Sequence, residues 1–101
     1  RWIGEYPDPL TYLSIFTTGN GVNGTGFADP AYDALIESAA REPTPAARLA
    51  ALQRAETHLL AQMPIAPLYW GSRTTLVATA VRGWKNSPLG FRNYKDIWLE
   101  K

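Results

Sequence analysis

The stretch DPAYDALIESAAREPTP, residues 29–45, predicts two consecutive helices at the centre of the chain. Asp29-Pro30 is a helix start, because an aspartate side chain caps the first free amides and proline suits the first helical position. Apolar residues then recur at offsets of three and four, which marks one buried helix face: Tyr32, Leu35, Ile36, Ala39 and Ala40. Glu42-Pro43 ends this helix, and Thr44-Pro45 starts a second helix that we expect to reach Gln62.

The segment upstream repeats this helix-start signal. Asp8-Pro9 predicts a short helix over residues 10–16, and we interpret Asp8 as its cap. The apolar and aromatic residues within 1–6 indicate a short strand. Residues 17–26 are rich in glycine and asparagine, which is typical of a loop.

The segment downstream is β-prone. Pro64 stops the long helix, and residues 65–70 indicate a buried strand. Residues 74–78 indicate a second strand, and residues 97–99 form a last short apolar segment. The order of strand, helix, loop, two helices and strands predicts an α/β or α+β fold in which helices cover a sheet.

On the long helix we expect one buried face and one solvent face. The residues assigned to the buried face are Leu49, Leu52, Leu59, Leu60 and Met63. The residues assigned to the solvent face are Arg48, Arg54, Glu56 and His58. Near the end of the chain, Trp84 and Trp98 are interpreted as core residues.

Composition excludes several classes of function. The 101 residues suit one domain or part of one, and 46% hydrophobic with 19% charged residues argues against whole-chain disorder. The net charge of +1 comes without a dense basic run, so no nucleic-acid partner is expected. No apolar run approaches the roughly 20 residues of a membrane span. With no cysteine and the single histidine His58, neither a metal site nor a cofactor is predicted.

Three segments of the chain carry a family resemblance. They are WIGEYPDP at residues 2–9, GTGFADPAYDALI at residues 24–36, and the helix followed by MPIAPLY at residues 55–69. In this order they resemble motifs in the C-terminal part of the extracytoplasmic peptide-binding proteins of ABC importers, the dipeptide and oligopeptide binders. Those proteins are about five times longer, so the resemblance implies a fragment of such a receptor.

The resemblance also implies a fold. The family has two α/β lobes, with helices packed on mixed sheets, that close over an extended peptide by a hinge motion. Residues 1–70 would form part of the second lobe. Residues 71–101 would cross back and complete the first lobe. Tyr69, Trp70 and Arg73 would lie near this crossing, where packing in a strand core is weighed against lining the cleft.

Residues 2–6 supply the candidate ligand site: Glu5, Trp2 and Tyr6. A carboxylate beside an aromatic wall suits the cationic end of a ligand, and the family places an aspartate at the position of Glu5 to pair with the peptide's α-ammonium. Glu5 is one methylene longer than that aspartate. The alternative readings are a surface glutamate for Glu5, a core tryptophan for Trp2 and a packing role for Tyr6.

The implied function is peptide capture outside the cytoplasmic membrane for import, in a periplasmic or extracytoplasmic, membrane-associated protein. Its partners would be a peptide and the permease subunits of the transporter. A non-peptide solute such as a metal chelate or haem, and a small autonomous interaction domain, stay open as alternatives. An enzyme using Glu5 and Asp8 as an acid–base pair is disfavoured because Asp8 serves better as a cap. Open strand edges from Thr74 onward would let a fragment self-associate.

Overall fold

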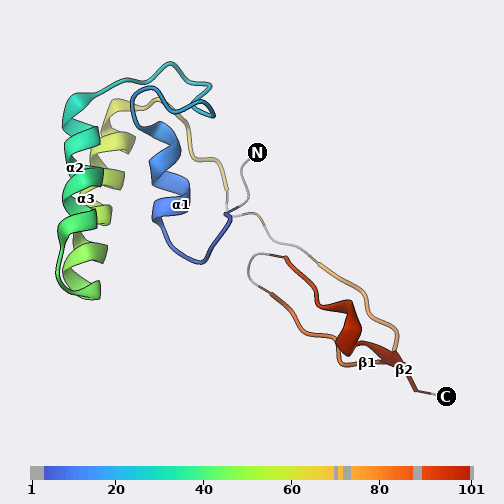
Figure 1. The fold of residues 1–101 in the computed structure, drawn as a ribbon. Helices are drawn as coiled ribbons and strands as arrows, with labels where there is room; N and C mark the ends of the chain where they lie inside the picture. The colour runs from blue at the N-terminus through green and yellow to red at the C-terminus, as the bar shows by residue number, and fades with distance from the viewer. Residues whose placement is uncertain (1–3, 70, 72–73, 88–89, 101) are drawn as a thin grey trace. The chain divides into compact units, whose positions relative to one another are not determined.

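The computed structural model describes residues 4–69, 71, 74–87 and 90–100 (Figure 1). The chain divides into two compact units, Arg1–Pro67 and Leu68–Lys101. The first unit is helical, and the second holds a small sheet. The chain therefore combines helices with strands, as the sequence predicts.

The helices of the first unit confirm the predicted ones almost to the residue. They are α1 (Leu10–Leu13) continued by the 3-10 turn η1 (Ser14–Phe16), α2 (Pro30–Arg41) and α3 (Pro45–Gln62). The Asp29 carboxylate accepts hydrogen bonds from the amides of Ala31 and Tyr32, and Thr44 Oγ1 accepts one from the amide of Ala47. Each cap thus satisfies amides that the first helical turn leaves free.

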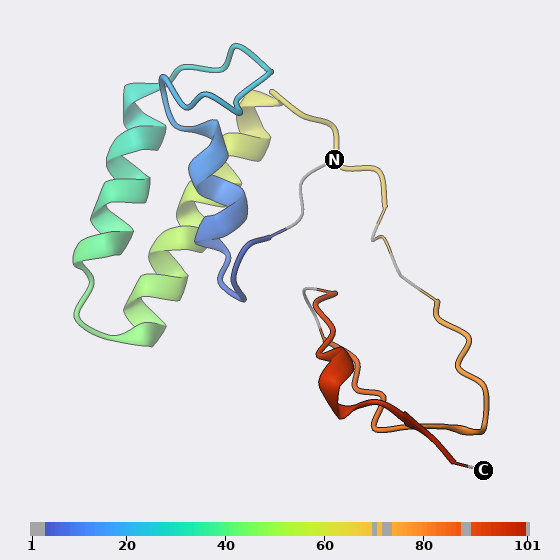
Figure 2. The ribbon, with the colours of Figure 1, turned by 45° about the vertical axis from the view of Figure 1, so that its right-hand side comes forward.

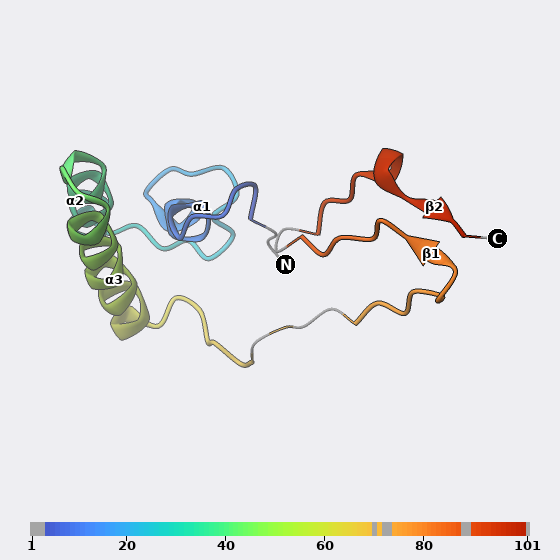
Figure 3. The same cartoon turned by 90° about the horizontal axis from the view of Figure 1, so that it is seen from below.

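These helices form one packed unit. In Figures 1 and 2, α2 and α3 lie side by side and antiparallel, joined by the short turn at residues 42–44. The short α1 packs beside this pair and contacts α3, as the view from below also shows (Figure 3). The segment just before α1 therefore lies next to a rigid helical pair.

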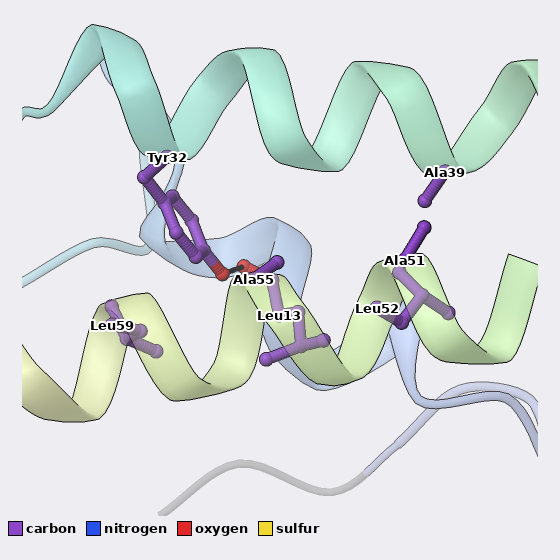
Figure 4. Close-up of a cluster of buried hydrophobic side chains, with 7 residues drawn as sticks. All are labelled: Leu13, Tyr32, Ala39, Ala51, Leu52, Ala55 and Leu59. Carbon is purple, nitrogen blue, oxygen red and sulfur yellow. Dashed lines mark hydrogen bonds between the residues drawn. The ribbon is translucent and has the colours of Figure 1, made fainter.

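The core of this unit sits between the three helices (Figure 4). Its buried residues are Leu13, Tyr32, Ala39, Ala51, Leu52, Ala55 and Leu59. Tyr32 is fully buried, and its hydroxyl donates a 2.7 Å hydrogen bond to the Leu13 carbonyl, which ties α2 to α1. Phe27 packs edge-on against the Tyr32 ring, with centroids 5.6 Å apart. Ala39 faces Ala51 across the helix pair, so only methyl groups separate the two helices there.

The second unit is built around a two-stranded antiparallel ladder. β1 (Val81–Arg82) pairs with β2 (Trp98–Leu99), with the 3-10 turn η2 (Tyr94–Asp96) just before β2. The ladder is extended by a 2.8 Å bond from the Glu100 amide to the Ala80 carbonyl. Gly83 follows β1 with φ +75°, and a Cβ there would lie 1.8 Å from the Asp96 carbonyl oxygen. Only glycine therefore fits this position.

Several predicted strands are wrong. The described residues 4–6, 65–69 and 74–78 are not strands, and in the first unit the helices pack on one another instead of on a mixed sheet. A strand forms only where a neighbouring strand accepts its backbone hydrogen bonds, and the described segments offer 65–69 and 74–78 no such neighbour. Pro67 also removes one backbone donor from the run at residues 65–69.

Burial on α3 follows a narrower face than predicted. Leu52 and Leu59 are buried as expected, but Leu49 is 47% exposed and Met63 is 65% exposed. Leu49 lies about one quarter turn away from the buried stripe of α3 on the helical wheel. Met63 caps α3 in the left-handed conformation, at φ 51°, so its side chain leaves the helix face.

Trp98 was predicted as core but is 59% exposed, because a two-stranded ladder covers little of so large a ring.

Candidate functional site

The candidate site lies in the turn just before α1. Glu5 and Tyr6 are consecutive residues there, and both are exposed, Tyr6 by 42%. Among the described residues no hydrogen bond or ion pair engages the Glu5 carboxylate. Trp2, the third predicted site residue, lies outside the residues that the structure describes. The structure thus brings Glu5 and Tyr6 together with their side chains accessible from solvent.

Side chains of α1 hold the backbone of this turn. The amide of Glu5 donates to Thr11 Oγ1 at 3.1 Å, and the amide of Gly4 donates to the Tyr12 hydroxyl at 3.3 Å. Gly4 is buried, and a Cβ there would lie 2.7 Å from the Tyr12 hydroxyl oxygen. A larger residue at this position would therefore have to displace the side chains of Tyr12 and Thr11. We call residues 4–8 the 4–8 loop.

Asp8 anchors the other end of the 4–8 loop. Its Oδ1 accepts the Leu10 amide at 2.8 Å, so Asp8 binds the first amide of α1 although the N-cap residue is Pro9, and both carboxylate oxygens accept from Arg48 on α3, at 2.6 and 3.0 Å. The Arg48 guanidinium holds the pKa of Asp8 below its usual range, and Asp8 in turn raises the pKa of Arg48. A two-pronged ion pair of this kind fixes orientation as well as distance. Asp8 is thus occupied as an anchor, which leaves Glu5 without an acid–base partner in this loop.

The predicted solvent face of α3 carries structural contacts. Arg48 and His58 were both assigned to solvent, yet each side chain is only 30% exposed and each pairs with an aspartate. His58 Nε2 lies 2.7 Å from Asp29 Oδ2, the same carboxylate that caps α2. This contact with His58 lowers the pKa of Asp29. Asp29 therefore joins the start of α2 to α3, as Asp8 joins the start of α1 to α3.

Three other residues were predicted to lie near a crossing between lobes: Tyr69, Trp70 and Arg73. Tyr69 is 85% exposed and so is not packed in a strand core, while Trp70 and Arg73 lie outside the described residues. In the second unit, Arg92 stacks over the Trp84 ring at 4.8 Å and lines a hollow there with Thr75.

A second hollow lies on the first unit, over α2 and α3. The residues that line it are Leu35, Ala50, Gln53, Arg54, Thr57, His58 and Ala61. Neither hollow includes Glu5 or Tyr6. Within residues 4–69, 71, 74–87 and 90–100, no group of three acidic or histidine side chains is placed to hold a metal ion. No helix in this part of the chain is long and apolar enough to cross a membrane.

Known proteins share sequence with almost the whole chain. The dipeptide-binding protein DppE of Bacillus subtilis is 34% identical over 100 residues, which cover 99% of this chain and 18% of DppE. The periplasmic murein peptide-binding protein MppA of Escherichia coli is 36% identical over 101 residues, covering 99% of this chain and 19% of MppA. The chain belongs to the family of dipeptide- and oligopeptide-binding proteins. It spans less than a fifth of the length of these two relatives.

A further relative agrees with this membership. The oligopeptide-binding protein OppA of Bacillus subtilis is 30% identical over 83 residues, which cover 81% of the chain and 15% of OppA. No family model matches the chain. The resemblance stated from residues 2–9, 24–36 and 55–69 is thereby confirmed at the level of the peptide-binding family.

Three residues that hold the 4–8 loop were missed by sequence reasoning: Arg48, Thr11 and Tyr12. Thr11 and Tyr12 sit in the first turn of a helix whose start was recognised, so their position next to the preceding loop was available as a signal. Arg48 is 40 residues from Asp8, and no local pattern links two positions so far apart.

Proposed function

We propose that this chain is part of an extracytoplasmic receptor that captures peptides and delivers them to the permease of an ABC transporter. The observation that carries the proposal is the match along 99% of the chain to DppE and MppA, both named for peptide binding. The receptor would act by binding, without a catalytic role. Its location would be the periplasm or the outer face of the cytoplasmic membrane, with membrane association and docking to permease subunits.

We further propose the two-lobed arrangement for the whole receptor. Residues 1–70 would belong to the second lobe, and residues 71–101 would cross back and complete the first. The division of the chain into units after Pro67, three residues before the proposed boundary, supports this assignment. Large exposed side chains in the second unit, such as Leu76 at 96% exposure, support a surface that other parts of a longer protein cover.

Within this receptor, Glu5 would receive the α-ammonium of the peptide, with Trp2 and Tyr6 beside it. A buried ammonium needs a paired charge, because desolvating it alone costs several kcal/mol. Two features support Glu5: its carboxylate has no partner among the described residues, and its own amide is fixed by Thr11.

Titration calorimetry on the full-length receptor tests this assignment. The probes are trialanine and N-acetyl-trialanine, which differ in the ammonium. We expect the receptor to bind trialanine and Glu5→Gln to weaken that binding, while Glu56→Gln, an equal charge change at an exposed position on α3, leaves it unchanged. Equal affinity of the wild type and Glu5→Gln for trialanine would remove Glu5 from the site. No binding by the wild type across alanine peptides of two to five residues would remove the peptide function itself.

A further inference from the structure

The contacts around the 4–8 loop single out one residue that lies far from this loop in sequence. Arg48 on α3 grips both oxygens of the Asp8 carboxylate, at 2.6 and 3.0 Å. Asp8 follows Glu5 by three residues, and the Asp8 amide bonds back to the Tyr6 carbonyl at 2.9 Å. The loop that carries Glu5 is therefore closed on itself and tied to a helix far away in sequence.

We propose that Arg48 is a positioning residue for peptide recognition, and that it acts through Asp8 to hold Glu5 in the orientation that meets a peptide ammonium. The inference rests on the proposed function of Glu5. It adds a residue of α3 whose side chain binds Asp8 and that would affect the peptide affinity through this contact.

The geometry explains why this anchor is needed in addition to α1. Thr11 and Tyr12 bind backbone amides, at 3.1 and 3.3 Å, but α1 is only four residues long. A helix of one turn has little stability of its own, so it holds the loop only if it is itself held. Arg48 lies on the 18-residue helix α3, which packs against α2 and supplies most of the buried core. The bond to Asp8 thus joins the loop to the most rigid part of the unit.

Both ends of the anchor favour a fixed geometry. The two side chains are about 30% exposed each, so the pair is partly shielded from water and salt. Guanidinium and carboxylate meet through two parallel hydrogen bonds, which restrict rotation as a single bond does not. Fixing a binding group before the ligand arrives lowers the ordering cost that binding would otherwise carry.

The sign of the effect separates positioning from simple electrostatics. Arg48→Met removes a positive charge near the 4–8 loop, and long-range attraction alone would then favour a cationic ligand head more strongly. Positioning predicts the opposite result, namely weaker binding of a peptide with a free ammonium. Arg54→Met is a matched control, because it makes the same charge change on the same helix and Arg54 has no ion pair among the described residues.

The test combines two measurements on the full-length receptor. Hydrogen exchange followed by NMR reports the loop without any ligand: Arg48→Met should speed exchange of the Glu5 and Leu10 amides by on the order of tenfold, and leave amides in the middle of α2 unchanged. Calorimetry with trialanine should show a loss of affinity on the order of tenfold for Arg48→Met. Arg54→Met should change neither quantity, and Arg48→Lys, which keeps one prong of the pair, should fall between.

Each outcome supports or overturns the positioning role of Arg48. Unchanged Glu5 and Leu10 exchange in Arg48→Met overturns the positioning role, whatever the ligand proves to be. Faster amide exchange together with undiminished or stronger trialanine binding also overturns it, because the 4–8 loop would then have become more mobile without a loss of affinity. If Glu5→Gln itself leaves trialanine binding intact, the proposed function of Glu5 fails first, and the inference about Arg48 fails with it.

Discussion

Replacing Tyr32 with phenylalanine should remove a hydrogen bond that crosses from α2 to α1 inside the core. The hydroxyl is fully buried and donates to the Leu13 carbonyl at 2.7 Å (Figure 4). A net loss of about 0.5–1.5 kcal/mol is usual for one hydrogen bond. We therefore expect Tyr32→Phe to lower the free energy of unfolding by roughly 0.5–1.5 kcal/mol.

Thermal unfolding of the 101-residue chain, followed by circular dichroism at 222 nm, measures this loss. For a domain of this size, 1 kcal/mol shifts the melting temperature by about 4–8 °C. Tyr94→Phe is the control, because the Tyr94 side chain is 70% exposed and should contribute little. The same small shift for both variants would refute the reasoning and would mean that water reaches the Leu13 carbonyl once the hydroxyl is gone.

Three further predictions concern two aspartates, a glycine with positive φ and an exposed segment that pairs with no strand. The pKa values of Asp8 and Asp29 are lowered in the folded chain, so the unfolded chain binds more protons at acid pH. The stabilisation that these two carboxylates provide is therefore present above about pH 4 and lost as the pH falls further. The stability of Asp8→Asn and Asp29→Asn should depend less on acid pH than that of the wild type, and parallel curves of stability against pH would contradict this. Gly83→Ala should disrupt the β1–β2 ladder, because its Cβ would meet the Asp96 carbonyl; retained cross-strand nuclear Overhauser effects would count against it. Residues 74–78 are exposed and pair with no strand in the described structure, so the 101-residue chain should self-associate with increasing concentration, unlike the variant Thr74→Pro; light scattering that reports a monomer at all concentrations would exclude this.

The helices were predictable because their signals are local. Asp29-Pro30 and Thr44-Pro45 each combine a side-chain acceptor with a preset proline, and both mark the start of a helix in the structure. The apolar period of three and four residues then placed Tyr32 in the core. Such features depend only on residues within one or two helical turns.

The strands and the loop anchor were not predictable for the converse reason. The run at residues 74–78 has strand composition, but composition does not provide the neighbouring strand that a ladder needs. The pair between Asp8 and Arg48 depends on how α1 meets α3, which only the packed helices determine. Glu5 and Tyr6 could be named as site candidates from their motif, whereas Arg48, which holds their loop through Asp8, lies 40 residues further along the chain.

The facing methyl groups of Ala39 and Ala51 set the spacing between α2 and α3 (Figure 4). A bulkier side chain at either position would act as a wedge and tilt α3, and the guanidinium that α3 carries would shift with it. If Arg48 positions Glu5 as proposed, a substitution between these two helices would also change the affinity for a peptide, although neither alanine belongs to the proposed ligand site.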